Sequence, residues 1–199
     1  MRPSSATVLA VVALAGFTVW ITRQAKALEE DLQVDSQRIA LLNKPAPDFR
    51  LTALDGRTVA LSDYRGKKKL LLVFWASWNN ASHPEMLSLS MLYQRAHTAD
   101  SDFDMVGISL DEERAAAQKF VEQSKTPFPV VLDAKRTLAD AYRIRSVPTV
   151  LLIDTGGKVD FGGVGFAQRG RAFELAQRLG VRAGDFRMEM GAPNAGRGN

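Results

Sequence analysis

The sequence predicts an α/β domain in which helices flank a central mixed sheet, and three observations carry this prediction. Segments with strand and helix character alternate along residues 70–179. Residues 70–76 (LLLVFWA) form an unbroken apolar run, which is typical of a strand buried on both faces at the centre of a sheet. Two strands at 149–153 and 158–164 flank the turn Asp154-Thr155-Gly156-Gly157, so we expect them to form an antiparallel hairpin at one edge.

The other elements follow from the local sequence pattern. Asp55-Gly56 is a hairpin-turn signal between two short segments with strand character, DFRLTAL and TVAL. Short apolar stretches predict two more strands, at 103–110 and 129–132. Apolar residues at helical spacing predict four helices, at about 82–97, 112–124, 135–142 and 168–179.

The N-terminal segment, residues 1–27, is predicted to be a membrane anchor. Residues 4–22 form an uncharged apolar stretch with a length near the lower limit for crossing a bilayer as a helix. Trp20 falls where an interfacial aromatic side chain would lie. The pattern Ala25-Lys26-Ala27 also fits a signal-peptide cleavage site, so a removable signal remains the alternative.

Three further parts of the chain follow the anchor. Residues 28–42 place apolar residues at near-helical spacing among charges, which predicts a short amphipathic stalk. The folded domain is expected to span residues 43–180, because Asn43-Lys44-Pro45-Ala46-Pro47 interrupts any helix at its start. Residues 181–199 are rich in glycine and poor in apolar clusters, so we expect a disordered tail.

Composition excludes several classes of function. The net charge is +4, yet no aromatic side chains interleave with the one tight cluster, Lys67-Lys68-Lys69, so we expect no nucleic-acid partner. The two histidines, His83 and His97, lack a second ligand at metal-binding spacing, so no metal and no cofactor are expected. The 199 residues contain no cysteine, which excludes disulfides, thiolate ligands and a cysteine nucleophile within them.

The junction between the central strand and the next helix, FWASWNNASHPEM at residues 74–86, carries the most specific motif. It resembles the junction of thioredoxin-like proteins of the membrane-tethered bacterial thiol-disulfide oxidoreductase family, the TlpA and ResA type within the redoxin (AhpC/TSA) superfamily. In that family the junction reads W-C-x-x-C, followed by a basic residue and x-E. Trp78 and Glu85 match this pattern, whereas Asn79 and Ser82 occupy the two cysteine positions.

Further motifs in the family's order extend the resemblance over about residues 43–179. They are Pro45-Ala46-Pro47-Asp48-Phe49, Leu61-Ser62-Asp63-Tyr64-Arg65-Gly66-Lys67, Ser109-Leu110-Asp111-Glu112, and Val147-Pro148-Thr149, which resembles the cis-proline loop beside the redox site. The resemblance implies a thioredoxin-like fold. It also implies a single-pass protein of the inner (cytoplasmic) membrane whose domain faces the periplasm, although the charges around the apolar stretch leave the orientation open.

The two substituted positions predict a site without thiol chemistry. A cysteine at a helix N-terminus is activated because free backbone N–H groups and the helix dipole stabilise its thiolate. Asn79 provides no redox couple, and the Ser82 hydroxyl is inert without a base, so we expect no catalytic residue. His83 is a poor base for Ser82 because adjacent side chains on a helix diverge. Asn and Ser are also favoured helix caps, and Ser82-x-x-Glu85 fits a capping box.

The surface around these positions is expected to bind a protein partner. In the family, backbone beside the cis-proline pairs with an extended peptide. The resemblance places this groove at Trp78, Asn79, Asn80, Ser82, Val147, Pro148 and Thr149.

The predicted function is a redox-inactive binding or accessory protein in an extracytoplasmic thiol-redox or envelope pathway. Two alternatives remain: a redoxin acting only through a cysteine-bearing partner, and an enzyme of another class using Ser82, His83 or Asn79. Asp111-Glu112-Glu113 is expected to begin a helix with charges that suit its dipole rather than to form a catalytic pair.

Overall fold

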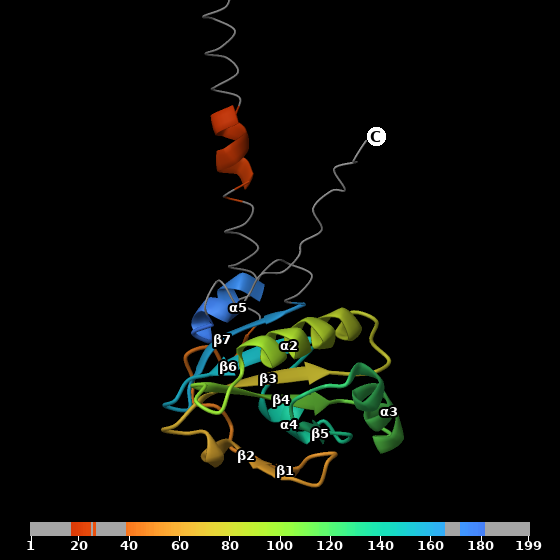
Figure 1. The fold of residues 1–199 in the computed structure, drawn as a ribbon. Coiled ribbons are helices and arrows are strands. Elements are labelled where there is room, and N and C mark those ends of the chain that lie inside the picture. The colour runs from red at the N-terminus through yellow and green to blue at the C-terminus, as the bar shows by residue number, and fades with distance from the viewer. Residues whose placement is uncertain (1–16, 25, 27–38, 166–171, 182–199) are drawn as a thin grey trace, which may run out of the picture. The chain divides into compact units, whose positions relative to one another are not determined.

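The computed structural model describes four stretches of the chain, residues 17–24, 26, 39–165 and 172–181 (Figure 1). The chain divides into two units, Met1–Arg38 and Ile39–Asn199. In the first unit, residues 17–24 are helical. No helix among the described residues has the length and apolar character needed to cross a membrane.

Parts of three predicted segments lie outside the described residues. They are most of the predicted anchor, residues 28–38 of the predicted stalk, and residues 182–199 of the predicted tail. Ile39 and Leu41, which the sequence pattern assigned to the stalk, are buried in the core of the second unit. The folded unit therefore includes residues that precede the proline-containing boundary.

A five-stranded mixed sheet forms the centre of the domain, in the order β5-β4-β3-β6-β7. Its strands are β3 (Lys69–Trp75), β4 (Phe103–Ser109), β5 (Val130–Leu132), β6 (Thr149–Ile153) and β7 (Val159–Val164). β3, β4 and β5 run parallel, whereas β6 and β7 pair antiparallel to their neighbours. The predicted mixed sheet with an antiparallel hairpin at one edge is confirmed.

The central strand β3 supplies side chains to two separate cores. Leu70, Leu72 and Phe74 enter the core on one face, and Leu71, Val73 and Trp75 enter the core on the other. All six side chains are at most 1% exposed. This double burial is why the strand shows no alternation of polar and apolar residues.

Helices cover one face of the sheet and a smaller layer covers the other. α2 (Ser82–Ala96), α3 (Arg114–Ser124) and α5 (Ala172–Arg178) pack on the face that receives Trp75. Met86, Leu89 and Leu92 of α2 are buried there. Each stabilises the fold by roughly 1.5–3 kcal/mol, because its apolar surface is removed from contact with water.

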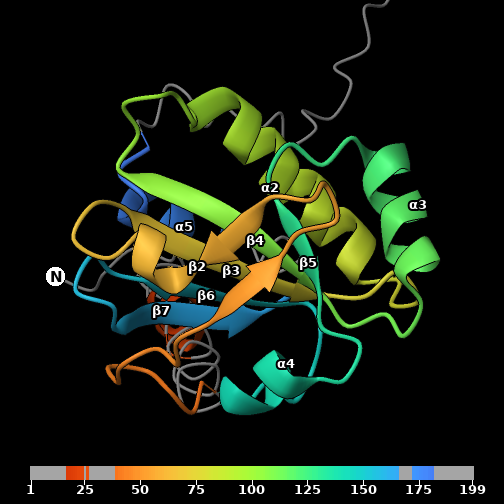
Figure 2. The ribbon, with the colours of Figure 1, turned by 90° about the horizontal axis from the view of Figure 1, so that it is seen from below.

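The opposite face is covered by α4 (Thr137–Ala141) and by the hairpin of β1 (Arg50–Thr52) and β2 (Thr58–Ala60), which is followed by a short 3-10 helix at Leu61–Asp63. Figure 2 shows these elements in front of the sheet and α2 behind it.

Two helices start later than the sequence predicts, and α4 is one of them, because it begins at Thr137 rather than at Lys135. α3 begins at Arg114, with Glu113 as its N-cap residue, so the predicted start at Glu112 is wrong by two residues. The described part of the last helix begins at Ala172, and the predicted start at Gln168 lies outside the described residues.

The topology brings four loops to the edge of the sheet at which β3, β4 and β5 end, which is not the lateral edge formed by β7. The parallel strands β3, β4 and β5 all end there, so the segments that follow them leave from the same side. Because β6 is antiparallel to β3, with Thr149 opposite Phe74, the Val147-Pro148 loop arrives at this edge as well. This edge positions every residue of the candidate site.

Candidate functional site

Asn79 holds the turn that leads into helix α2. Its side-chain oxygen Oδ1 accepts hydrogen bonds from the backbone N–H groups of Ala81 and Ser82, at 2.9 and 3.1 Å. The Ser82 N–H also donates to the backbone carbonyl of Asn79 at 2.9 Å, so Asn79 holds the turn that leads into α2 through its amide and its main chain. The helix itself has Ala81 as its N-cap and Ser82 as its first residue, so the expected Ser82–Glu85 capping box is wrong.

Ser82 is fully buried behind this turn. Its hydroxyl accepts a hydrogen bond from the N–H of Ala76 at 3.4 Å and donates one to Asn79 Oδ1 at 3.5 Å. His83 points elsewhere, because its Nε2 lies 2.8 Å from the carbonyl oxygen of Ser77 and its ring packs edge-on against Phe120. The arrangement provides Ser82 with neither access to a substrate nor a base, which disfavours a hydrolase.

The Val147-Pro148-Thr149 loop lies at the same edge of the sheet, and its Val147–Pro148 peptide bond is cis. Pro148 and Thr149 are buried, and the Thr149 hydroxyl donates to the carbonyl of Ser146 at 2.7 Å. Val147 is half-buried. Within the described residues, no hydrogen bond engages the backbone N–H or carbonyl of Val147. The loop therefore presents an unpaired main-chain donor and acceptor.

The predicted groove residues divide into a buried set and an accessible set. Ser82, Pro148 and Thr149 are buried, and Asn79 is half-buried with its amide oxygen engaged. Trp78 is 64% exposed, and Asn80 is exposed beside it. The accessible side chains at this edge are therefore Trp78, Asn80 and part of Val147.

Asp111 is a site residue whose role the sequence analysis missed. It is 1% exposed and accepts hydrogen bonds from the Ser77 hydroxyl at 2.8 Å, the Ser77 backbone N–H at 3.0 Å and the Ser109 hydroxyl at 2.8 Å. The expectation that Asp111 begins a helix is wrong. Its carboxylate instead links the segment after β3 to the end of β4, and so holds the residue that precedes Trp78.

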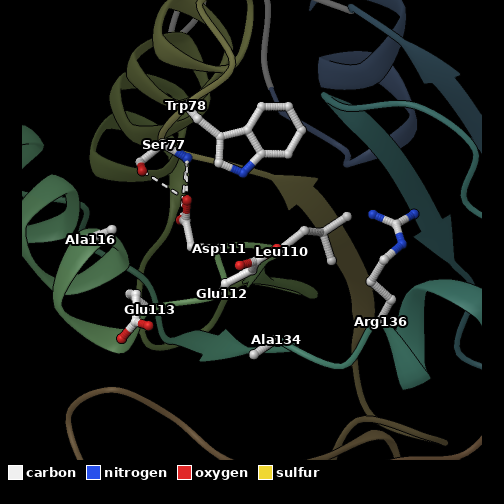
Figure 3. A pocket seen from close by; sticks show the side chains of 9 residues that line it. All are labelled: Ser77, Trp78, Leu110, Asp111, Glu112, Glu113, Ala116, Ala134 and Arg136. Atoms are coloured by element: carbon white, nitrogen blue, oxygen red, sulfur yellow. Dashed lines mark hydrogen bonds between the residues drawn. The ribbon is translucent and has the colours of Figure 1, made fainter.

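A cavity of about 420 Å³ opens beside Trp78 (Figure 3). Its walls come from the segments that follow β3, β4 and β5, and they include Ser77, Trp78, Leu110, Asp111, Glu112 and Arg136. The sequence signal for this cavity was the acidic run after a buried parallel strand, at the edge where ligands of open α/β sheets usually bind.

Comparisons with known proteins show the family and the fold of this chain. A family model of the AhpC/TSA family matches residues 42–161, which is more than half of the chain. The chain belongs to the AhpC/TSA family. Thiol-disulfide oxidoreductase ResA of Geobacillus thermodenitrificans is 35% identical over 114 residues. That alignment covers 57% of this chain and 64% of the relative, so the chain spans just under two thirds of the relative's length.

Solved structures of similar proteins confirm the thioredoxin-like α/β fold. A thiol-disulfide oxidoreductase from Bacteroides fragilis, 30% identical, superposes with a TM-score of 0.57 over 66% of this chain and 99% of its own. A protein from Chlorobium tepidum, assigned as thiol:disulfide interchange protein DsbE, is 31% identical and gives a TM-score of 0.58 over 69% of this chain and 96% of its own. By fold and homology, this AhpC/TSA chain is therefore related to thiol-disulfide oxidoreductases.

Proposed function

We propose that this chain is a redox-inactive member of its family that binds an extended segment of a partner protein. The observation that carries the proposal is the state of Asn79 and Ser82. Their side chains fill the positions where the family's motif has cysteines, and both are engaged in holding the start of α2. Neither group can be oxidised and reduced reversibly, so the fold keeps the site's shape without its chemistry.

The binding mode rests on the backbone of Val147. Its unpaired N–H and carbonyl can form two main-chain hydrogen bonds with an extended segment, as in strand addition to a sheet edge. Trp78 adds a large exposed apolar surface on the segment that follows β3, the strand paired with β6. A bound segment would lie across Val147 and Asn80 and contact the indole.

We also propose a location for this function. The apolar stretch at residues 4–22 supports attachment to the inner membrane, and the family resemblance supports a domain on the periplasmic side, where the accessory role would lie in a thiol-redox or envelope pathway. A reporter fused after Asn199 tests the orientation. Alkaline phosphatase should be active and a green fluorescent protein dark; the opposite pattern contradicts the proposed side.

An activity measurement tests the absence of redox chemistry. The purified chain should not accelerate the reduction of insulin by dithiothreitol above the uncatalysed rate. The double variant Asn79→Cys with Ser82→Cys restores the family's two cysteine positions and should form a reducible disulfide. Turnover by the wild-type chain contradicts the proposal, and failure of the double variant to oxidise shows that the site geometry has also changed.

Photo-crosslinking tests the binding role. A benzoyl-phenylalanine at Asn80 should give discrete adducts in intact membranes, and the additional change Trp78→Ala should reduce them. The matched control places the same probe at Asp100, an exposed residue in the turn after α2. Equal adducts from both positions would show that the site has no preferred partner.

A further inference from the structure

The cavity beside Trp78 has the position and size of a ligand site. It lies beyond the carboxyl ends of β3, β4 and β5, where open α/β sheets bind their ligands. Its volume of about 420 Å³ falls in the range of small-ligand pockets. Figure 3 shows the Trp78 indole over the cavity, with its ring nitrogen toward Leu110.

The charges around the cavity are unbalanced. Three carboxylates, those of Asp111, Glu112 and Glu113, and one guanidinium, that of Arg136, line the cavity. Asp111 is engaged by serine donors, and Arg136 donates to the carbonyl of Ile144 at 3.3 Å. Glu112 and Glu113 are exposed, and within the described part of the chain their carboxylates have no hydrogen-bond or ion-pair partner. The cavity is therefore acidic, although the chain carries a net charge of +4.

The tryptophan adds a second feature that suits a cation. An indole face attracts an ammonium or guanidinium group and also packs against the methylenes that carry it. Trp78 is 64% exposed, yet the segment that bears it is fixed, because Asp111 holds both the N–H and the hydroxyl of Ser77. Among the described residues, no three His, Cys, Asp or Glu side chains are placed so that they could hold a metal ion together.

We propose that this cavity is a subsite for a lysine or arginine side chain of the bound segment. The alkyl part of that side chain packs against Trp78 and Leu110, and its cationic end reaches the carboxylates of Glu112 and Glu113. The inference rests on the proposed binding of an extended segment at Val147. It adds the chemical class of partner, which is a segment that carries a basic residue.

Small-molecule probes test the subsite independently of peptide binding in the groove. The full chain, ¹⁵N-labelled in detergent, is titrated with N-acetyl-lysine N-methylamide and with the norleucine analogue, which lacks the charge. The indole N–H signal of Trp78, assigned with Trp78→Phe, should shift with the lysine probe only. Equal shifts, or none with the lysine probe, overturn the inference.

Charge variants identify the carboxylates. Glu112→Gln with Glu113→Gln should weaken the lysine probe about five- to tenfold through loss of its ionic partners. The matched control, Asp100→Asn with Glu122→Gln, removes the same charge from exposed positions away from the cavity and should leave the affinity within about twofold. Equal weakening by both pairs shows a general effect of net charge and contradicts the subsite.

Peptides separate this inference from the proposed function. A nine-residue peptide with a central lysine should shift the amide signals of Val147 and Thr149 together with the Trp78 indole. If the norleucine peptide binds equally well, the groove stands and the cationic subsite fails. If the lysine probe shifts Trp78 but no peptide shifts Val147, the cavity binds cations and the proposed groove fails.

Discussion

The two ends of helix α2 are held by different chemistry. At its start the interacting groups are uncharged. The Asn79 amide oxygen accepts hydrogen bonds from two backbone N–H groups and from the buried Ser82 hydroxyl. At its end, titratable groups gather. The Tyr93 hydroxyl donates to Asp104 Oδ1 at 3.0 Å, and the Tyr93 ring stacks on the imidazole of His97 with centroids 4.1 Å apart.

The proposed binding surface lies at the start of α2, whereas the pH-dependent interactions lie at its end. The start of α2 follows the segment that bears Trp78, so an uncharged turn there should keep the proposed binding surface unchanged over a wide range of pH. The end of α2 lies where the chain turns into β4, away from that edge, and its interactions depend on protonation. Changes at the two ends should therefore have different signatures.

The largest effect is expected at the segment that leads into α2. Asp111→Ala removes the acceptor for three hydrogen bonds and leaves the Ser77 N–H unsatisfied, which should lower the free energy of unfolding by about 3 kcal/mol. Urea denaturation measures this loss. Glu112→Ala, one residue further and exposed, should change it by less than about 0.5 kcal/mol. Similar losses of stability in both variants would contradict the structural role of Asp111.

A smaller loss is expected at the other end of α2. Tyr93→Phe removes a hydrogen bond to a charged and half-buried carboxylate, so the free energy of unfolding should fall by about 1.5 kcal/mol. Tyr64→Phe is the control, because the half-buried Tyr64 hydroxyl has no hydrogen-bond partner in the described residues. A loss at Tyr64 as large as at Tyr93 would show that ring packing, not the Asp104 bond, is measured.

The Asn79 side chain should contribute less to the free energy of unfolding than Asp111 or Tyr93. Asn79→Ala removes one capping acceptor and should lower the free energy of unfolding by about 1 kcal/mol. Asn79→Asp keeps an acceptor at a helix N-terminus, where negative charge is favourable, and should retain or exceed wild-type stability. Thermal unfolding of the three proteins at pH 7 measures the order. An aspartate variant less stable than the alanine variant contradicts the capping role.

Local patterns predicted much of this molecule, and tertiary pairing accounts for the parts they missed. The unbroken run of β3 and the Asp154-Thr155-Gly156-Gly157 turn specify their elements through nearest neighbours, so both were predicted. Asn79 was one of two candidate caps, because Asn and Ser have the same preference. Choosing between them requires the path of the turn, which places Ser82 inside the helix.

The role of Asp111 could not be predicted from the local sequence pattern. Followed by two glutamates, it resembles the acidic start of a helix. Its partner Ser77 lies 34 positions earlier and meets it only because β3 and β4 pair in parallel and end together. The same convergence forms the cavity beside Trp78. Such sites depend on strand order, which residue spacing within one segment does not reveal.

The smallest effect is a pH dependence that belongs to the end of α2 alone. Burial lowers the pKa of His97 below its ordinary value of 6.5; Asp104 opposes this, and Lys68 adds to it. A lowered pKa means that the unfolded chain binds the proton more readily. The stability from neutral His97 is therefore complete above pH 6.5 and declines as the pH falls through the folded-state pKa. Urea midpoints between pH 7.5 and 5 should show this decline in the wild type, and it should be weaker in His97→Gln. An identical decline in His97→Gln would assign the pH dependence to other groups and remove the contrast between the two ends.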